Sequence, residues 1–185
     1  LDGALVATGA GITQSGGVLT ITGTTTLAAG ANDITLNGAN DFSTVLITNG
    51  NNVALTDANG IILGASTVGG TLAVTTTSGT ITDSGNVSVV GNVTLNDVAL
   101  AGITLGTLQA DSNVILTAAG NTAITNDTIL NLEGAVTGTL GATATTGGIT
   151  DSGTLSVTGN ATFNDVALAG ITLGTLQADS NVILT

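Results

Sequence analysis

The sequence predicts an all-β fold, a parallel β-helix in which successive turns of one chain stack into a rod. Three observations predict it: a block of sequence that occurs twice, a shorter period through the whole chain, and a composition that favours strands and tight turns. Because repeat arrays bury a continuous core only by stacking their units, we expect one continuous β-solenoid over residues 1–185.

The duplicated block gives the longer period. Residues 149–185 repeat residues 81–117 at an offset of 68, and 32 of the 37 positions are identical. From Asn96 in the first copy and Asn164 in the second, the two copies are the same to their ends. A repeat this close indicates an array of structural units.

An apolar residue followed by threonine gives the shorter period. Successive dipeptides are offset by 22, 21, 26, 22, 21, 25 and 22 in sequence number, and three successive steps sum to 69 or 68. We therefore expect three coils per sequence repeat and about eight coils of about 22 residues, with Ile81, Ile103 and Ile124 in vertical register. The dipeptides begin at Ile12, Ile34, Leu55, Ile81, Ile103, Ile124, Ile149 and Ile171.

Strand and turn signals alternate along the chain. Runs rich in Val, Ile and Thr favour strands, because these side chains fit a pleated, half-buried surface. Such runs occupy residues 18–22, 71–75, 87–89 and 93–95. Asn-Gly, Asn-Asp and Ser-Gly pairs then mark the corners, since Gly and Asn tolerate positive φ. Corner pairs lie at 37–38, 49–50, 59–60, 84–85, 96–97 and 152–153.

Composition excludes several classes of protein. The chain is 42% hydrophobic, which is too apolar for a disordered polypeptide, and it has no apolar run long enough to form a membrane helix. Its formal charge is −12 and it contains no Lys, Arg or His. Phosphate binding depends on basic side chains, so we expect no nucleic-acid partner.

Two long segments carry a resemblance to a known family. They are GITQSGGVLTITGTTTLAAGANDITLNGANDF at 11–42 and VALTDANGIILGASTVGGTLAVTTTSGTITDSG at 53–85. Their style of repeat resembles that of filamentous-haemagglutinin-type large exoproteins, the secreted partners of two-partner secretion systems. The resemblance implies a right-handed parallel β-helix at the cell surface of a Gram-negative bacterium or outside it, as an adhesin shaft or fibre. It assigns no functional residues, and the family's secretion and terminal domains have no counterpart in these segments.

Catalytic chemistry has few candidates. Without His, Cys or Lys there is no Ser-His-Asp arrangement, thiolate or Schiff base. Paired carboxylates could in principle hydrolyse glycosides, yet the chain has no basic group and only two aromatic residues to hold a sugar. The acids are Asp2, Asp33, Asp41, Asp57, Asp83, Asp97, Asp111, Asp127, Glu133, Asp151, Asp165 and Asp179.

We therefore expect these acids to lie in turns and on the surface. Three of them recur in the second copy of the duplicated block, whereas an active site is rarely duplicated with its scaffold. No calcium-loop motif is present, and weak cation binding remains the alternative for the acids. The prediction names no catalytic residue, no cofactor and no metal ligand.

The sequence thus predicts a structural, non-catalytic segment of an extracellular fibre or adhesin stalk, and we expect it to be a fragment of a longer repeat array. Its expected partners are further coils of that array, or copies of itself that associate end to end or laterally, together with contacts to cell surfaces or matrix. The alternative is a surface binding module for glycans, cells or ice. Ice binding would need continuous ladders of threonine pairs such as Thr20 with Thr22, Thr80 with Thr82, and Thr143 with Thr145.

Overall fold

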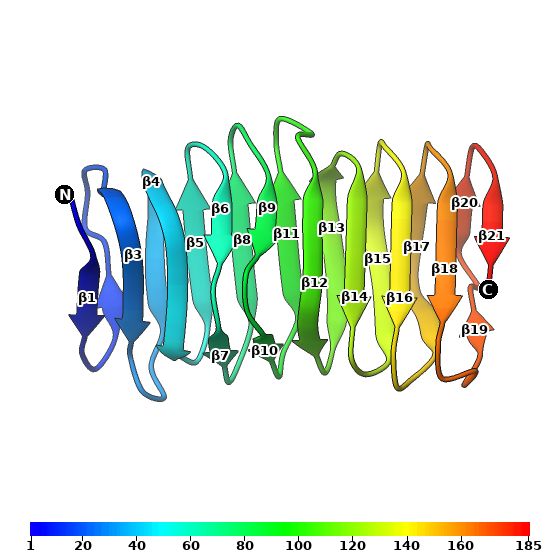
Figure 1. Ribbon diagram of the computed structural model, residues 1–185, viewed down its shortest axis with the longest axis horizontal. Helices are drawn as coiled ribbons and strands as arrows, with labels where there is room; N and C mark the ends of the chain where they lie inside the picture. The colour runs from blue at the N-terminus through cyan, green and yellow to red at the C-terminus, as the bar shows by residue number, and fades with distance from the viewer.

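In most strands of this protein, successive side chains point alternately into the interior and toward the surface. In the computed structural model, β5 (Val53–Asp57) and β8 (Leu72–Thr76) each bury their first, third and fifth residues. The model describes the backbone of residues 1–185 and the side chains of 1–117 and 120–185. The chain winds into an elongated rod with the two termini at opposite ends (Figure 1).

Two sheets, A and B, run along the rod. Sheet A contains β1 (Leu5–Thr8), β3 (Thr20–Ala28), β6 (Ile61–Leu63), β7 (Ser66–Val68), β9 (Ile81–Asp83), β10 (Val87–Val89), β12 (Ile103–Ala110), β14 (Thr122–Asn126), β16 (Leu140–Ala144), β18 (Ala161–Asp165) and β21 (Val182–Leu184). Sheet B contains β2 (Ile12–Thr13), β5, β8, β11 (Val93–Asp97), β13 (Asn113–Ala119), β15 (Leu130–Val136), β17 (Ile149–Val157), β19 (Ile171–Thr172) and β20 (Leu176–Ala178). The long strand β4 (Ile34–Asn49) begins in sheet B and ends in sheet A.

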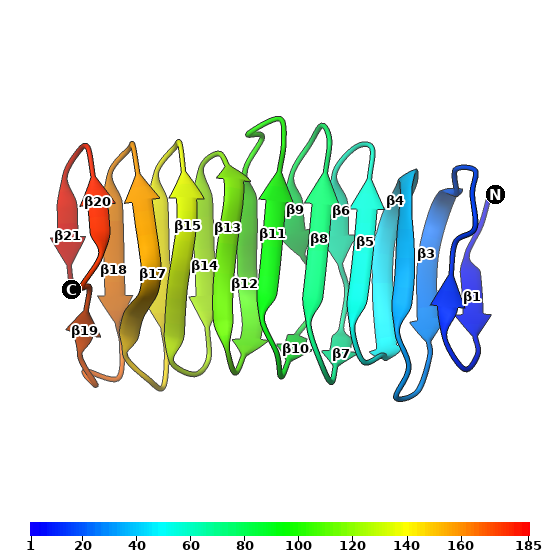
Figure 2. The same ribbon diagram turned by 180° about the vertical axis from the view of Figure 1, so that it is seen from behind.

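Each strand pairs in parallel with the strand one coil before it and the strand one coil after it. Sheet A faces the viewer in Figure 1 and its strands run downward, whereas the strands of sheet B run upward in the view from behind (Figure 2). Because the chain advances from left to right in Figure 1, the winding is right-handed. The predicted fold class, an all-β right-handed parallel β-solenoid, is confirmed.

The coils are slightly shorter and more numerous than the sequence period suggested. The rod has about nine turns of about 20 residues, so both the predicted number and the predicted length of the coils need this correction. Ile81 pairs with Ile103 as predicted. Ile124, however, pairs with Leu105, and Ile103 pairs with Thr122. The register of the next coil is therefore set two residues earlier than the dipeptide pattern indicated.

The predicted three coils per sequence repeat become three and a half. In sheet A, Ile103 pairs with Thr122 and Thr122 with Leu140, so three coil steps separate Ile81 from Leu140. Ile149 then follows in sheet B, where it pairs with Ile171. Because the two sheets of a coil are similar, the same sequence unit can begin in sheet A or in sheet B. The pattern crosses between sheets at its two long steps, one ending at Ile81 and the other at Ile149.

Stacked aliphatic side chains fill the space between the sheets. In sheet B, Val53, Leu72, Val93 and Val114 lie in one column, each fully buried and paired with the next. A single coil could not cover these side chains, so neighbouring coils supply both the hydrogen bonds and the apolar contacts that order the chain. The described residues form no helix long and apolar enough to cross a membrane.

Candidate functional site

Several acidic side chains serve as hydrogen-bond acceptors between coils. Asp83 accepts hydrogen bonds from the backbone N–H groups of Gly106 and Thr107, at 2.9 and 2.7 Å, and from the Thr107 hydroxyl at 2.7 Å. Thr107 also donates to the carbonyl of Gly85. A charged acceptor for backbone donors of the next coil fixes the register of the two coils.

The second copy repeats this arrangement on the opposite sheet. Asp151 accepts from the N–H groups of Gly174 and Thr175, at 2.7 and 2.8 Å, and from the Thr175 hydroxyl at 3.2 Å. Thr175 donates to Gly153 in the same way. The two aspartates are thus one structural device used twice, as the duplicated sequence suggested.

A second pair of aspartates holds two corner loops in shape. Asp97 is fully buried and accepts from the N–H of Gly102 at 2.6 Å, while its carbonyl accepts from the N–H of Leu100. Asp165 does the same for Gly170 at 2.5 Å and for Leu168. In each carboxylate the Oδ1 atom is buried without a hydrogen-bond partner among the described residues.

Two further acids have perturbed pKa values with opposite signs. Burial raises the pKa of Asp57 above its ordinary value of 3.8, although hydrogen bonds from the N–H groups of Phe42 and Asn59 oppose the shift. The N–H of Asn52 and the side chain of Asn51 hold the pKa of exposed Asp33 below that value. The nearby carboxylate of Asp41 adds a smaller contribution that also raises the pKa of Asp57.

The prediction that the acids lie in turns and on the surface is therefore correct for some and wrong for others. Asp111 and Asp179 are exposed after strand ends, as expected. Asp57, Asp97 and Asp165 instead lie inside the coils, where each caps backbone N–H groups. The sequence signal was present, because each of the three closes an alternating strand at an inward position.

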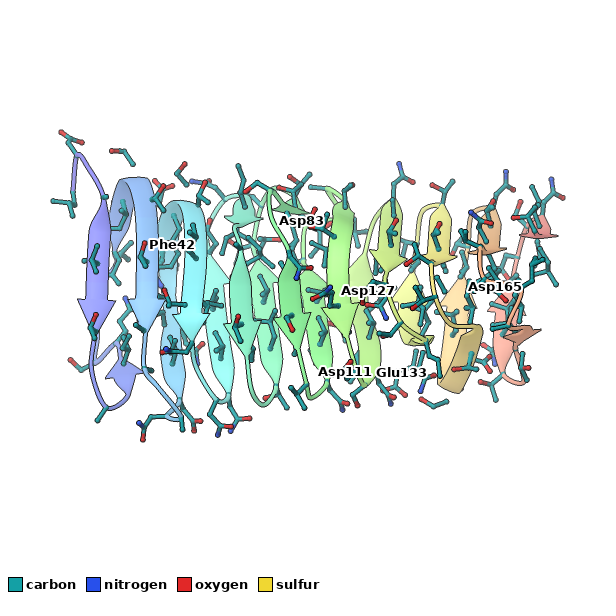
Figure 3. The ribbon with its side chains drawn as sticks, turned by 60° about the horizontal axis from the view of Figure 1, so that its bottom comes forward. Phe42, Asp83, Asp111, Asp127, Glu133 and Asp165 are labelled. Atoms are coloured by element: carbon teal, nitrogen blue, oxygen red, sulfur yellow. The ribbon has the colours of Figure 1, made fainter. Side chains whose placement is uncertain are left out.

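The acids are dispersed along the rod. Asp83, Asp127 and Asp165 lie at separate places along the rod, and Asp111 and Glu133 are drawn near one another at its lower edge in this view (Figure 3). Within the described part of the chain, no three Asp, Glu, His or Cys side chains gather closely enough to hold a metal ion.

Asparagine side chains add further contacts between coils. Asn52 and Asn121 each accept from the backbone N–H of a threonine in the next coil, Thr71 at 3.1 Å and Thr139 at 2.9 Å. Asn131 donates to the side-chain oxygen of Asn113 at 2.7 Å, which is a direct step from one amide to the next. The asparagines therefore connect neighbouring coils through threonine as well as through one another.

A surface groove is the best candidate for a binding site. Asn86 donates to Gln109 at 2.5 Å and Gln109 donates to Asp127 at 2.5 Å, so three coils are connected by one chain of side chains. These residues line a groove of about 260 Å³ together with Thr107, Leu108 and others. The groove offers amides, hydroxyls and one carboxylate, and no basic or aromatic side chain. Sequence reasoning missed it because its residues come from separate coils.

Comparison with known proteins identifies the class of repeat. A family model described as "Repeats of unknown function (DUF5649)" matches residues 1–49, 50–119 and 119–185. These three units cover the whole chain, so the protein belongs to this repeat family. The second and third units begin at residues 50 and 119, a spacing within one residue of the offset between the two copies of the duplicated block. No curated protein and no solved structure matches the chain.

Proposed function

We propose that this chain is a structural, non-catalytic segment of an extracellular fibre or adhesin stalk. The observation that carries the proposal is the use of the polar side chains. Asp83, Asp97 and their copies accept hydrogen bonds from backbone N–H groups in the same or the next coil, so the side chains most suited to chemistry maintain the coil. In a catalytic or ligand-binding site, such side chains would instead be exposed in a pocket and directed toward one shared point.

The rod is suited to mechanical persistence. Its coil-to-coil hydrogen bonds run parallel to the long axis and share a load applied between the termini. The lack of Lys and Arg removes trypsin sites, and the lack of Cys and Met removes the side chains most easily oxidised. The sequence resemblance to large exoproteins supports an extracellular place on a Gram-negative bacterium, with more coils or further copies as neighbours.

Digestion by a protease of broad specificity tests this function. Proteinase K should leave the folded chain intact under conditions that fully degrade a urea-unfolded sample, because the strands are paired with their neighbours along the whole rod. Force spectroscopy on the chain held at its two ends should show high resistance with stepwise loss of coils. Rapid digestion of the folded chain, or extension at forces no higher than an unfolded chain needs, would contradict a load-bearing role.

The groove at Asn86, Gln109 and Asp127 favours one alternative, a binding module for neutral glycans. Amide and hydroxyl groups are suitable partners for sugar hydroxyls, and the groove is about the size of a small ligand at 260 Å³. A glycan array probed with the wild-type chain and with Gln109→Ala would decide it. Glycan binding that the substitution removes would support the binding module. Absence of glycan binding would leave the structural role as the one supported function. Ice binding has less support, since Thr125 and Thr143 pair but the column continues to Asn164.

A further inference from the structure

The two apolar loops, residues 97–102 and 165–170, are the feature that the fold itself does not explain. Both have the sequence Asp-Val-Ala-Leu-Ala-Gly and join one sheet to the other. Val98 and Leu100 are 52% and 43% exposed, and Val166 and Leu168 are 57% and 86% exposed. The two valines are more than half exposed. Leu100 is partly covered by Gly120 of the next coil, whereas no described coil follows Leu168.

The loops hold these side chains outward in a fixed conformation. In each, the leucine N–H donates to the carbonyl of the aspartate three residues earlier, at 3.0 Å for Leu100 and 3.2 Å for Leu168. Both leucines adopt positive φ, 58° and 56°, where an L-residue other than Gly or Asn is disfavoured. The strained backbone costs free energy, and 43% of Leu100 and 86% of Leu168 remain exposed.

The second copy of the repeat is rotated by half a turn about the rod axis relative to the first, so the two loops lie on opposite edges of the rod. The loop after β11 projects at the upper edge of Figure 1, and the loop after β18 projects at the lower edge. They are separated by three and a half coils, about 17 Å along the axis at the usual strand spacing. A flat partner such as a bilayer could contact only one of these edges at a time.

The surroundings of Leu100 carry no exposed charge. Five successive corners of the upper edge, residues 77–80, 98–102, 120–121, 137–139 and 158–160, contain no acid. The chain has a formal charge of −12 and no basic residue, so two copies repel each other wherever carboxylates would face. The upper edge is a surface over which like-charged rods can approach closely.

On the lower edge, the projecting loop that contains Leu168 lies beside a groove. This groove, of about 370 Å³, is lined by Ile129, Gly147, Gly148, Gly170 and others. A Cβ atom on Gly147 would lie 2.7 Å from the backbone of Ile129, so the glycine keeps this part of the edge low. A projection and a recess side by side suit a two-fold contact, in which each copy inserts into the other.

From these observations we propose that the two apolar loops are lateral docking points for a second copy of this chain. Because the loops alternate between opposite edges, each rod can contact one neighbour on either side, and an array of repeats would assemble into a planar bundle. The inference rests on the proposed structural role and deepens it by naming the contact between rods.

Sedimentation of the whole chain tests the proposal. We expect a contact made by six-residue loops to bury less than the roughly 800 Å² per partner of a stable complex, and association therefore to develop between about 10 µM and about 1 mM. The double variant Leu100→Asn with Leu168→Asn should lower the association constant by at least about tenfold. Asn accepts positive φ, so the loops keep their shape. Val90→Thr removes an apolar group whose exposure, 57%, lies between those of the two leucines, and it copies the residue at Thr158, so it should associate like the wild type.

Disulfide trapping gives a second readout, because the chain has no cysteine of its own. Leu100→Cys should form covalent dimers under mild oxidation, and Val90→Cys should form far fewer. A wild-type chain that stays monomeric at about 1 mM, or two cysteine variants that cross-link equally, would overturn the lateral contact. Circular dichroism separates the two proposals: a monomer rich in β-structure refutes only the docking, whereas loss of β-structure refutes the rod.

Discussion

Residues 81–117 and 149–185 have nearly the same sequence, and their equivalent residues lie on opposite sheets of one rod, such as Asp83 in sheet A and Asp151 in sheet B. Asp83 and Asp151 cap the next coil with the same three hydrogen bonds. Asn92 and Asn160 accept from the serine hydroxyl of the next coil, at 2.6 and 2.7 Å. These contacts therefore depend on the chain and its immediate neighbour, and the face on which they lie is irrelevant to them.

The copies differ where their interiors meet different neighbours. Leu95 pairs with Val74 and Leu116, whereas its counterpart Phe163 pairs with Ala142 and Leu184. Phe163 is fully buried, and the small side chain of Ala142 leaves room for the ring. The comparison teaches that polar contacts are copied with the repeat, while core volumes are adjusted column by column.

The largest expected effect comes from exchanging these core residues. Leu95→Phe should destabilise the rod by about 2 kcal/mol, because Val74 fills the space that Ala142 leaves open for Phe163. Adding Val74→Ala should recover most of that loss. Urea unfolding followed by circular dichroism measures both variants. Equal stability of the single and double variants would show that Ala142 is not the reason Phe163 fits.

Removal of the capping carboxylate tests whether the two copies are equivalent. Asp83→Ala and Asp151→Ala should each lower the free energy of unfolding by about 1.5 kcal/mol, since each leaves backbone N–H groups of the next coil without an acceptor. Asp111→Ala and Asp179→Ala, which change exposed carboxylates, are the matched controls and should have effects near zero. Unequal losses at Asp83 and Asp151 would mean that the face matters after all.

A stabilising substitution is expected in the apolar loops. Leu100→Asn should raise the free energy of unfolding by about 1 kcal/mol, because Asn adopts positive φ more readily and 43% of the leucine is exposed. Thermal unfolding of the single variant measures this. A clear destabilisation would indicate that the Leu100 side chain packs on its own rod, and would weaken its assignment to a partner.

The smallest effects concern pH, and their signs are opposite. Asp33 has a folded pKa below 3.8, so its contribution is present above that value and is lost as the pH falls through the folded pKa. Asp57 has a raised folded pKa, so the rod loses stability as the pH rises from 3.8 through the folded value. Urea unfolding across the acidic range up to neutral pH should show that Asp33→Asn removes the first dependence and Asp57→Asn the second. A profile of Asp57→Asn identical to that of the wild type would exclude burial of this charge.

Much of the architecture was predictable from local signals. Alternating runs such as 93–95 and corner pairs such as Asn59-Gly60 indicated the strands and turns, and the duplication indicated a stacked array. The predicted corners at 37–38, 96–97 and 152–153 were wrong, because they lie within β4, β11 and β17. The length of the coil was less predictable. Apolar residues two positions apart, such as Ile103 and Leu105, both point inward, so the pattern could not decide which of them pairs with Ile124.

The sequence by itself determined that this protein is a β-solenoid, that its acids would face no basic partner, and that its polar contacts would recur with the repeat. Only the tertiary structure decided that one repeat spans three and a half coils. As a result, each strand residue of the second copy lies on the sheet opposite to that of its counterpart in the first. The physical reason is that sequence period records which residues point inward, whereas the number of residues in a coil depends on how each corner closes. The groove at Asn86, Gln109 and Asp127 follows from that stacking, because its side chains meet only when three coils lie in register.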